Sequence, residues 1–324
     1  MAELAGLSED ERALVQTAPP PHGADVMKAV LNRVAFSDPA WVFERKLDGI
    51  RCLAVRDGDT LTMHSRNDLD LGARYPEVAD AIKAQRDGSR FAIDGEVVAF
   101  EGSETSFAKL AARGHHPVPV FYYVFDVLWL DGYDVRPLPL RTRKRLLHDA
   151  ISFADPLRWT PHRNRDGEKL FRDACRKGWE GVIAKRADSP YRSTRSKDWQ
   201  KFKCEAGQEL VIGGFTAPRG SRTEFGALLL GYYDKRTLRY AGKVGTGFDT
   251  DTLRSLGARM RKLAVDDPSF ADPGSIRERG VTWVRPTLVA EIGFTEWTTA
   301  GRLRHPRFLG LRDDKSAKQV VRES

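Results

Sequence analysis

A lysine with charged neighbours on both sides is the residue in this chain best suited to covalent chemistry. Residues 44–51 read E-R-K-L-D-G-I-R, and apolar runs lie directly before and after this segment. Two apolar runs separated by Asp48-Gly49 predict two strands joined by a tight turn, with the Lys46 amine at the mouth of the hairpin. Such an amine becomes a nucleophile when burial or nearby cations remove its proton near neutral pH. The same pattern would also suit a surface hairpin whose charges are solvated.

Acidic residues lie within or directly before two segments whose apolar pattern is typical of buried strands. Asp94-Gly95-Glu96 divides the apolar stretch 91–100, and Glu180 stands directly before the apolar residues 181–184. Carboxylates in such places are costly unless they bind a cation or a polar ligand. A tight turn with exposed carboxylates is the alternative for residues 94–96.

Basic and aromatic side chains form a second set of candidates. Residues 199–203 read W-Q-K-F-K, so Lys201 and Lys203 share one face of a strand and repel each other unless an anion such as a phosphate bridges them. Residues 122–128 form an aromatic strand, and one ring at a pocket edge could stack on a base, a contact worth about 1–3 kcal/mol. For each charged segment alone, a solvated strand is the better explanation, and most of the aromatic residues are expected to be core.

The order of these segments is more specific than any one of them. Along the chain they read K-x-D-G-x-R, S-R-N, D-G-E, an aromatic strand, E-G-V-x-x-K and W-x-K-x-K, and residues 308–315 add F-L-G-L-R-D-D-K. This order resembles the covalent nucleotidyltransferase superfamily of ATP-dependent DNA ligases, RNA ligases and capping enzymes. The dipeptide E-W at 296–297 and L-R-H-P at 303–306 are similar to the ligase domain of bacterial end-joining ligases. The resemblance covers about residues 24–322.

The resemblance implies a reaction in which Lys46 attacks the α-phosphorus of ATP and forms a lysyl-AMP intermediate. AMP would then pass to a DNA 5′-phosphate, from which the 3′-hydroxyl of a nick would displace it. Asp48 would orient Lys46 or a metal-bound water. Lys201, Lys203 and a divalent cation would lower the pKa of Lys46. Glu96 and Glu180 would hold Mg²⁺ or Mn²⁺, hard ions that favour carboxylate oxygens.

The resemblance also assigns nucleotide contacts. The adenine amino group would bind to Glu44, the purine ring would stack on Phe125, and the ribose would contact Arg51 and Glu96. The phosphates would be bound by side chains that include Arg66 and, on a second domain that closes over the site, Arg312 and Lys315. The implied nucleotide-binding set is therefore Glu44, Arg51, Arg66, Glu96, Phe125, Lys185, Lys201, Lys203, Arg312 and Lys315.

The pattern of strands and helices predicts an α+β protein of two domains. Residues 1–23 read as a polar leader, and residues 24–205 alternate strand-like and helix-like stretches, as expected of an adenylation domain built from antiparallel sheets with helices. In residues 206–324, about five short strands, Gly- and Pro-rich turns and one helix at 251–263 suit an oligonucleotide-binding (OB-fold) β-barrel.

The charge of the chain favours a polyanionic partner. The formal net charge is +8 and the isoelectric point is near 9.4. Residues 301–324 carry seven Lys/Arg against three Asp/Glu. With the basic residues of the helix at 251–263, they could line a duplex backbone, although a solvated basic face is the alternative. The resemblance implies nicked or broken duplex DNA as that partner and adds a Ku-type end-binding protein. The basic helix residues are Arg254, Arg259, Arg261 and Lys262.

The cysteines and the apolar stretches bear on the cellular location. Cys52, Cys175 and Cys204 are far apart and have no metal-ligand spacing, so we expect three small apolar side chains, no disulfide and a reducing cytosol. The N-terminal residues contain neither a basic leader nor an apolar core, and no stretch approaches the roughly 20 apolar residues of a membrane span. The expectation is a cytoplasmic monomer without a membrane segment.

Two other functions fit the same residues. An RNA ligase or a capping-type guanylyltransferase would use the same lysine, although Glu44 and the C-terminal motif disfavour capping. A catalytically silent module that only binds DNA ends would need neither the lysine nor the metal-binding carboxylates.

Overall fold

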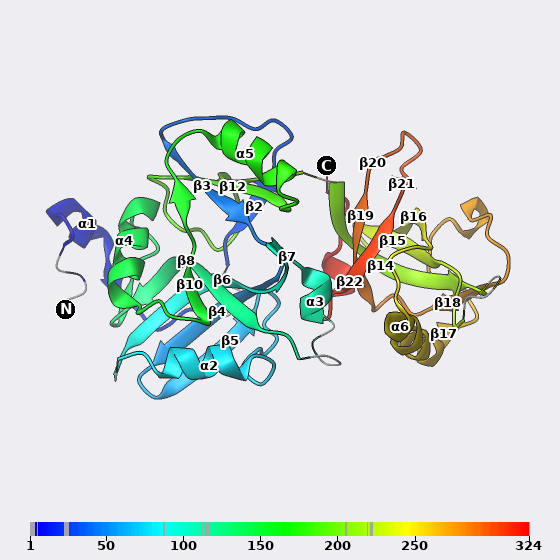
Figure 1. The fold of residues 1–324 in the computed structure, drawn as a ribbon, viewed down its shortest axis with the longest axis horizontal. Coiled ribbons are helices and arrows are strands. Elements are labelled where there is room, and N and C mark those ends of the chain that lie inside the picture. Colours follow the sequence, from blue (N-terminus) through cyan, green and yellow to red (C-terminus); the bar gives the residue numbers. More distant parts are fainter. Residues whose placement is uncertain are drawn as a thin grey trace. The chain divides into compact units, whose positions relative to one another are not determined.

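The chain folds into two compact units, residues 1–204 and residues 205–324 (Figure 1). The computed structural model describes residues 4, 6–22, 26–86, 88–111, 113, 117–204, 206–218, 220 and 223–323. Among the described residues, no helix is long and apolar enough to cross a membrane. Each unit has its own apolar core.

The first unit contains a large sheet in the order β1-β9-β8-β6-β4-β5, with β10 beside β8 and β7 beside β6. One face packs against α2 (Pro76–Lys83) and α4 (Leu140–Ala150), whose Ile82 and Leu147 are fully buried there. All the strand pairs are antiparallel except β10 with β8. The strands are β1 (Gln16–Thr17), β4 (Ile50–Asp57), β5 (Thr60–Ser65), β6 (Arg90–Glu101), β7 (Glu104–Thr105), β8 (Val120–Leu130), β9 (Tyr133–Asp134) and β10 (Leu157–Trp159).

A second sheet of the same unit has the order β11-β3-β12-β13-β2. Helix α5 (Gly167–Arg176) covers one face, where its Leu170 and Ala174 pack against Phe43, Val182 and Phe202. The opposite face is therefore left for the side chains that alternate with these. The strands are β2 (Lys28–Leu31), β3 (Trp41–Lys46), β11 (His162–Arg163), β12 (Gly181–Arg186) and β13 (Arg195–Lys203).

The register of this sheet gathers the candidate residues on the face away from α5. Lys46 lies opposite Gly181, which in turn lies opposite Lys203, and Ile183 lies between Glu44 and Lys201. Residues directly opposite one another point to the same face. As the alternation of residues 199–203 predicts, Lys201 and Lys203 lie on one face of the strand, and Phe202 lies in the core on the other.

The predicted hairpin around Asp48-Gly49 is wrong. Strand β3 pairs with β11 and β12, whereas β4 pairs with β5 and β6, so the chain leaves one sheet at Lys46 and joins the other at Ile50. A Cβ atom on Gly49 would lie 2.2 Å from the carbonyl oxygen of Val97. The glycine is required by this close passage over β6 rather than by a two-residue turn.

The N-terminal segment is held on the first unit. It begins with a short helix, α1 (Glu9–Leu14), and its strand β1 then extends the large sheet by pairing with β9. The carbonyl oxygen of Ala18 accepts a hydrogen bond of 2.7 Å from the indole of Trp129, and Leu7 is buried in the core of the large sheet. The polar leader is thus part of the packed unit.

The second unit is a strongly β structure with one long helix. Its sheet runs β16-β15-β14-β18-β17, with β19 paired to both β14 and β22, and a separate pair β20-β21. Leu256 and Met260 of α6 (Thr250–Lys262) pack into the core of this sheet. The strands are β14 (Ala206–Thr216), β15 (Leu228–Asp234), β16 (Thr237–Val244), β17 (Ala264–Val265), β18 (Val281–Val284), β19 (Val289–Phe294), β20 (Glu296–Trp297), β21 (Leu303–Arg304) and β22 (Arg307–Leu311).

Short helices complete the two units. In the first unit, α3 (Phe107–Ala111) follows β7. The second unit has two 3₁₀ turns, η3 (Pro273–Ser275) and η4 (Ala317–Gln319).

The prediction of three unpaired cysteines is correct for Cys52 alone. Cys52 is free and buried in the core, but Cys175 and Cys204 form a disulfide with their Cα atoms 5.2 Å apart. Cys175 lies in the last turn of α5, and Cys204 directly follows β13. Because α5 packs on the sheet that contains β13, a separation of 29 residues in sequence becomes a contact in space.

Candidate active site

Lys46 ends β3 in an ion pair. Its Nζ lies 2.6 Å from Oε2 of Glu180, and the two side chains are only 18% and 25% exposed. Glu180 stands immediately before β12, the strand that pairs with β3. The residue predicted to be the nucleophile is therefore half-enclosed and next to one of the two predicted metal-binding carboxylates.

The Glu180 carboxylate lies among three cations. Lys203 Nζ is 4.0 Å from Glu180 Oε1, and Lys201 is close enough for its charge to act on the carboxyl. Burial opposes the ionised form, but the charges of Lys46, Lys203 and Lys201 outweigh burial and lower the pKa of Glu180. An anion does lie near the paired lysines, as their repulsion requires, and in this structure it is a carboxylate of the protein.

Glu44 is buried between two lysines. Its Oε1 lies 2.5 Å from Nζ of Lys144, and its Oε2 lies 2.8 Å from Nζ of Lys185. Burial would raise the pKa of the Glu44 carboxyl, yet the two ammonium groups more than compensate and lower it. Burial also lowers the pKa of Lys185 to about 8, against the attraction of Glu44. The acceptor predicted for the adenine amino group thus already has two cationic partners.

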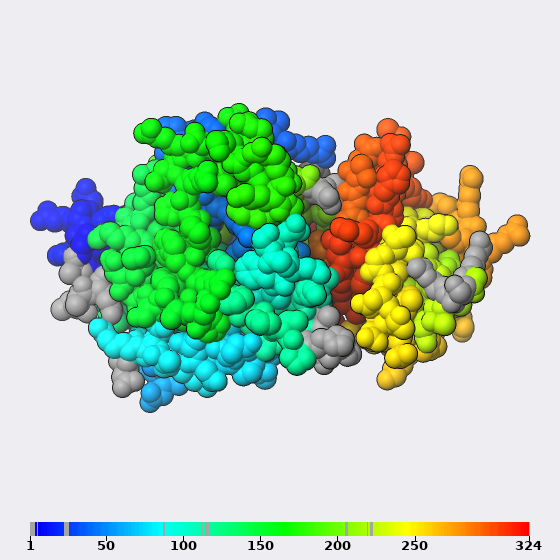
Figure 2. Space-filling view, viewed as in Figure 1, coloured from blue at the N-terminus to red at the C-terminus, as the bar shows by residue number. Residues whose placement is uncertain are grey.

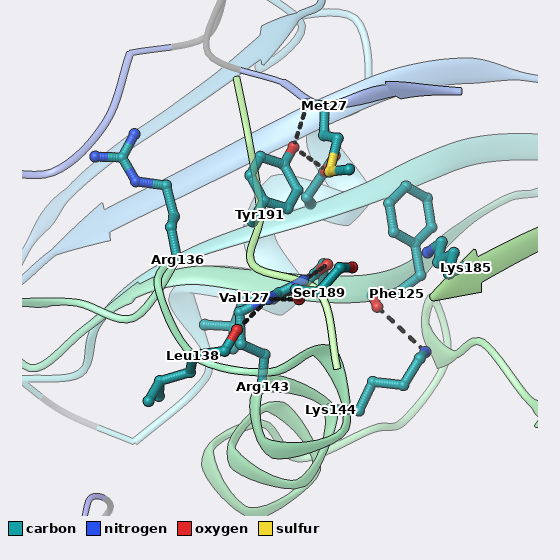
Figure 3. A network of polar contacts seen from close by, with 12 residues as sticks. Met27, Phe125, Val127, Arg136, Leu138, Arg143, Lys144, Lys185, Ser189 and Tyr191 are labelled. Atoms are coloured by element: carbon teal, nitrogen blue, oxygen red, sulfur yellow. Dashed lines mark hydrogen bonds and ion pairs between the residues drawn. The ribbon is translucent and has the colours of Figure 1, made fainter. Parts of the chain in front are cut away.

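Phe125 lies beside this charged group with its ring buried. Nζ of Lys185 is 4.0 Å from the centre of the Phe125 ring and 4.1 Å from that of Trp199. The two rings meet edge to face, with their centroids 6.0 Å apart. Phe125 comes from β8 of the large sheet and Lys185 from β12 of the small one, so the two sheets meet at this ring (Figure 3).

Arg51 is held by the carboxylate of Asp94, which the motifs did not predict as its partner. Its Nε and Nη2 each lie 2.5 Å from one oxygen of Asp94, and Nη2 also donates to the carbonyl oxygen of Met27 at 3.1 Å. The Tyr191 hydroxyl donates to Asp94 at 2.6 Å and accepts from the Met27 N–H at 2.8 Å. Glu96 lies opposite Arg51 in the register of β4 and β6. The predicted ribose-binding pair is therefore together.

Two other predicted residues belong to nearby turns. Asp48 accepts a hydrogen bond of 3.1 Å from the N–H of Phe107, the first residue of α3, and its own N–H donates to Thr105 at 3.0 Å. Arg66 directly follows β5 and acts electrostatically on Lys28 of β2. Burial, and then the charges of Arg66, Arg195 and Arg51, lower the pKa of Lys28. This part of the unit is cationic.

The C-terminal motif lies in the second unit, where both of its basic residues have acidic partners. Arg312 pairs with both oxygens of Asp314, at 2.8 and 2.9 Å, and lies 3.4 Å from Glu291. Lys315 Nζ is 2.8 Å from Glu209. Arg312 is almost completely buried. Either cation would therefore meet a phosphate with an acidic partner already beside it.

The basic residues of α6 are on the surface of the second unit, where α6 is drawn in yellow in Figure 2. Three of them have acidic neighbours. Arg254 lies 3.8 Å from Asp251 in the same helix, and the other two pair with residues outside it. These two pairs are Arg259 with Asp313 at 2.9 Å and Arg261 with Glu224 at 2.5 Å.

The donor set suits a hard divalent cation only in part. The described residues contain no cluster of three or more His, Cys, Asp or Glu side chains that could hold a metal. Mg²⁺, however, usually binds through one or two carboxylates, with water and substrate phosphates as further ligands. Glu180, kept ionised by its lysines, and Glu96 provide carboxylates of this kind.

Comparison with known proteins gives the class. The model of the ATP dependent DNA ligase domain matches residues 22–203, and that of the ATP dependent DNA ligase C terminal region matches residues 221–315. The chain belongs to the ATP-dependent DNA ligase family. The predicted fold class, a nucleotidyltransferase domain followed by an OB-fold domain, is confirmed.

Two similar proteins are named for end joining. The chain is 38% identical to the multifunctional non-homologous end joining protein LigD of Pseudomonas aeruginosa over 297 residues, which are 87% of this chain and 35% of that protein. It is 37% identical to LigD of Mycobacterium tuberculosis H37Rv over 287 residues, 87% of this chain and 37% of that protein. The chain thus spans about a third of the length of these relatives.

A solved structure matches over nearly the whole chain. Mycobacterial DNA ligase D complexed with ATP and MES has a TM-score of 0.67 and 35% identity, and the match covers 92% of this chain and 98% of that one. The predicted resemblance to the ligase domain of bacterial end-joining ligases is therefore confirmed.

Lys144 and Asp94 are the site residues to which the motifs assigned no role. Lys144 lies in α4 with Leu140 and Leu147, at the spacing that faces a core. A lysine on the apolar face of a helix is a signal of a buried partner. Asp94 was visible as an acidic residue in a strand, but its pairing with Arg51 depends on strand register, which the sequence alone does not define.

Proposed function

We propose that this chain is an ATP-dependent DNA ligase that joins 5′-phosphate and 3′-hydroxyl ends through a lysyl-AMP intermediate. The proposal depends most on one observation, the Lys46–Glu180 ion pair of 2.6 Å on a sheet face that also carries Lys201 and Lys203. A half-enclosed amine on a sheet face with two other lysines suits attack on a nucleotide phosphate. The relatives named as end-joining proteins support a role in DNA end joining or repair.

In the first step, Lys46 must separate from Glu180 and lose a proton. Its nitrogen lone pair then forms a P–N bond to the α-phosphorus of ATP, and the bond to the bridging α–β oxygen breaks to release pyrophosphate. Lys201 and Lys203 would stabilise the charge that develops on the α-phosphate. Glu44, Lys185 and Phe125 would hold the purine, and Arg51 and Glu96 the ribose.

The later steps use the same groups on DNA. The 5′-phosphate of a DNA end displaces Lys46 from AMP, and the 3′-hydroxyl of the neighbouring end then displaces AMP. A divalent cation, Mg²⁺ or Mn²⁺ held by Glu96 and Glu180, would supply neutralisation of phosphate charge. Asp48 and Arg66 would support the lysine and the phosphate end. Arg312 and Lys315 would orient the β- and γ-phosphates from the second unit.

The partners follow from this activity, whereas the cytoplasmic location stays a prediction that the Cys175–Cys204 disulfide does not support. The basic residues of α6 and of the C-terminal segment would contact the backbone of nicked or broken duplex DNA. A Ku-type end-binding protein is proposed as a partner because the relatives are named for end joining. We place the protein in the cytoplasm, as a monomer.

The test is covalent labelling. Protein is first treated with pyrophosphate, which removes any AMP already attached, and is then incubated with α-labelled ATP and Mg²⁺ or Mn²⁺. Label should appear on wild type and be absent from Lys46→Ala, and intact mass should increase by about 329 Da, one AMP. Lys83→Ala, which changes an exposed lysine of α2, is the control. Equal labelling of Lys46→Ala would falsify the proposed nucleophile.

Substrate comparison separates the alternatives. Labelling by GTP in place of ATP would indicate a capping-type enzyme. Faster sealing of an RNA-containing nick than of an all-DNA nick would indicate an RNA ligase. Binding of DNA ends by a protein that cannot be labelled would indicate a silent end-binding module.

A further inference from the structure

A buried lysine that belongs to none of the nucleotidyltransferase motifs joins two elements of the candidate purine site. Nζ of Lys144 lies 2.5 Å from Oε1 of Glu44 and donates a hydrogen bond of 3.2 Å to the carbonyl oxygen of Phe125. Figure 3 shows its side chain extending from α4 towards that carbonyl. Lys144 is 4% exposed, so these contacts are made away from water, where each charge interaction is stronger.

The helix that carries Lys144 is itself fixed in place. The neighbouring Arg143 makes two hydrogen bonds to Asp126, of 2.8 and 3.0 Å, and both side chains are completely buried. Arg143 also donates to the carbonyl oxygens of Leu138 and Ser189, the latter at 2.9 Å. Because Asp126 directly follows Phe125 in β8, the helix and the strand are joined at two successive residues.

Lys144 is one of the two cationic partners of Glu44. Each oxygen of the Glu44 carboxylate lies next to a different lysine. Oε1 is next to Lys144 of α4, and Oε2 is next to Lys185 of β12. Without Lys144, Glu44 would be drawn to Lys185 alone, and the carbonyl oxygen of Phe125 would lose its donor. A buried carboxylate that loses one of its partners reorients or takes up water.

We propose that Lys144 is a positioning residue of the purine subsite, which fixes Glu44 and the main chain at Phe125 and so contributes to the selection of adenine over guanine. The inference rests on the proposed function in one respect, that Glu44 and Phe125 contact the purine. A purely structural role, in which Lys144 only holds α4 on the sheet, predicts loss of folded protein without a change in base preference.

The test measures equilibrium binding, so it is independent of Lys46 chemistry. Wild type, Lys144→Met and the control Lys83→Met are treated with pyrophosphate and titrated calorimetrically with α,β-methylene-ATP and α,β-methylene-GTP, which cannot transfer AMP. Lys144→Met keeps most of the side-chain volume and removes the charge. We expect its Kd for the adenine analogue to rise about tenfold, the order of one hydrogen bond to a charged group. Its preference for adenine should fall by a similar factor.

The ratio of the two Kd values does not depend on the fraction of folded protein, so it separates positioning from simple destabilisation. Lys144→Gln, which retains a donor, provides a folded variant if Lys144→Met does not fold, and should show a smaller shift in the same direction. The inference is overturned if the folded variant keeps the wild-type Kd and ratio. Wild type that binds neither analogue would count against the nucleotide site itself, whereas a wild-type preference for adenine retained in the variant counts against Lys144 alone.

Discussion

The disulfide between Cys175 and Cys204 allows a quantitative prediction. It closes a loop of about 30 residues, since the two cysteines are 29 positions apart. That loop contains Glu180, Lys185, Lys201 and Lys203. A cross-link of this span stabilises a folded chain by about 3–4 kcal/mol, chiefly by reducing the entropy of the unfolded chain. We expect Cys204→Ser to lower the free energy of unfolding of the first unit by about that amount.

The assay is denaturant unfolding with and without a thiol reductant. Reductant should destabilise wild type to the level of Cys204→Ser and leave Cys204→Ser unchanged, because the variant has no cross-link to lose. Thiol titration of the denatured, unreduced protein should detect one free thiol, Cys52, of the three cysteines in the chain. Three free thiols, or wild-type stability in the variant under both conditions, would refute the cross-link and the loop argument together.

Three other variants test buried polar contacts of the first unit. Arg143→Met leaves Asp126 as a buried charge without its bidentate partner and should destabilise the protein by about 3–5 kcal/mol in denaturant unfolding, whereas an effect below about 1 kcal/mol would contradict a tight buried pair. Tyr191→Phe removes the hydroxyl that orients Asp94 and should cost about 1–2 kcal/mol by the same measurement, with no change if that hydroxyl is solvated instead. The pKa of Lys185 is about 8 in the folded protein, below its ordinary value of 10.5 in the unfolded chain. Between these two pH values the unfolded chain binds more protons, so the free energy of unfolding should rise with pH. Lys185→Met should lack this rise, and identical pH profiles of the two proteins would count against the low pKa.

The local structure could be predicted well where the pattern of apolar residues was long and regular. The apolar stretch 91–100 lies in β6 (Arg90–Glu101), and the helix predicted at 251–263 is α6 (Thr250–Lys262). These elements are defined by alternation or by helical spacing, both of which are local properties of the sequence.

Long-range pairing could not be predicted in the same way. Residues 44–51 look like a hairpin because two strands flank a Gly, and nothing local reveals that the strands belong to different sheets. The disulfide required the packing of α5 against the small sheet, and the partners of Glu44 required the position of α4. Each depends on which elements meet in the tertiary structure, which the order of motifs does not specify.

The ionic groups of the candidate site are compensated by the protein itself. Lys46 pairs with Glu180, Glu44 with two lysines, and Arg51 with Asp94. If these side chains bind the nucleotide as proposed, its entry would be an exchange of counterions, in which phosphate replaces a carboxylate, rather than the filling of a bare cationic pocket. On the same proposal, the carboxylates would return to their former partners when the spent nucleotide departs, which would lower the cost of release and prepare the site for another turnover.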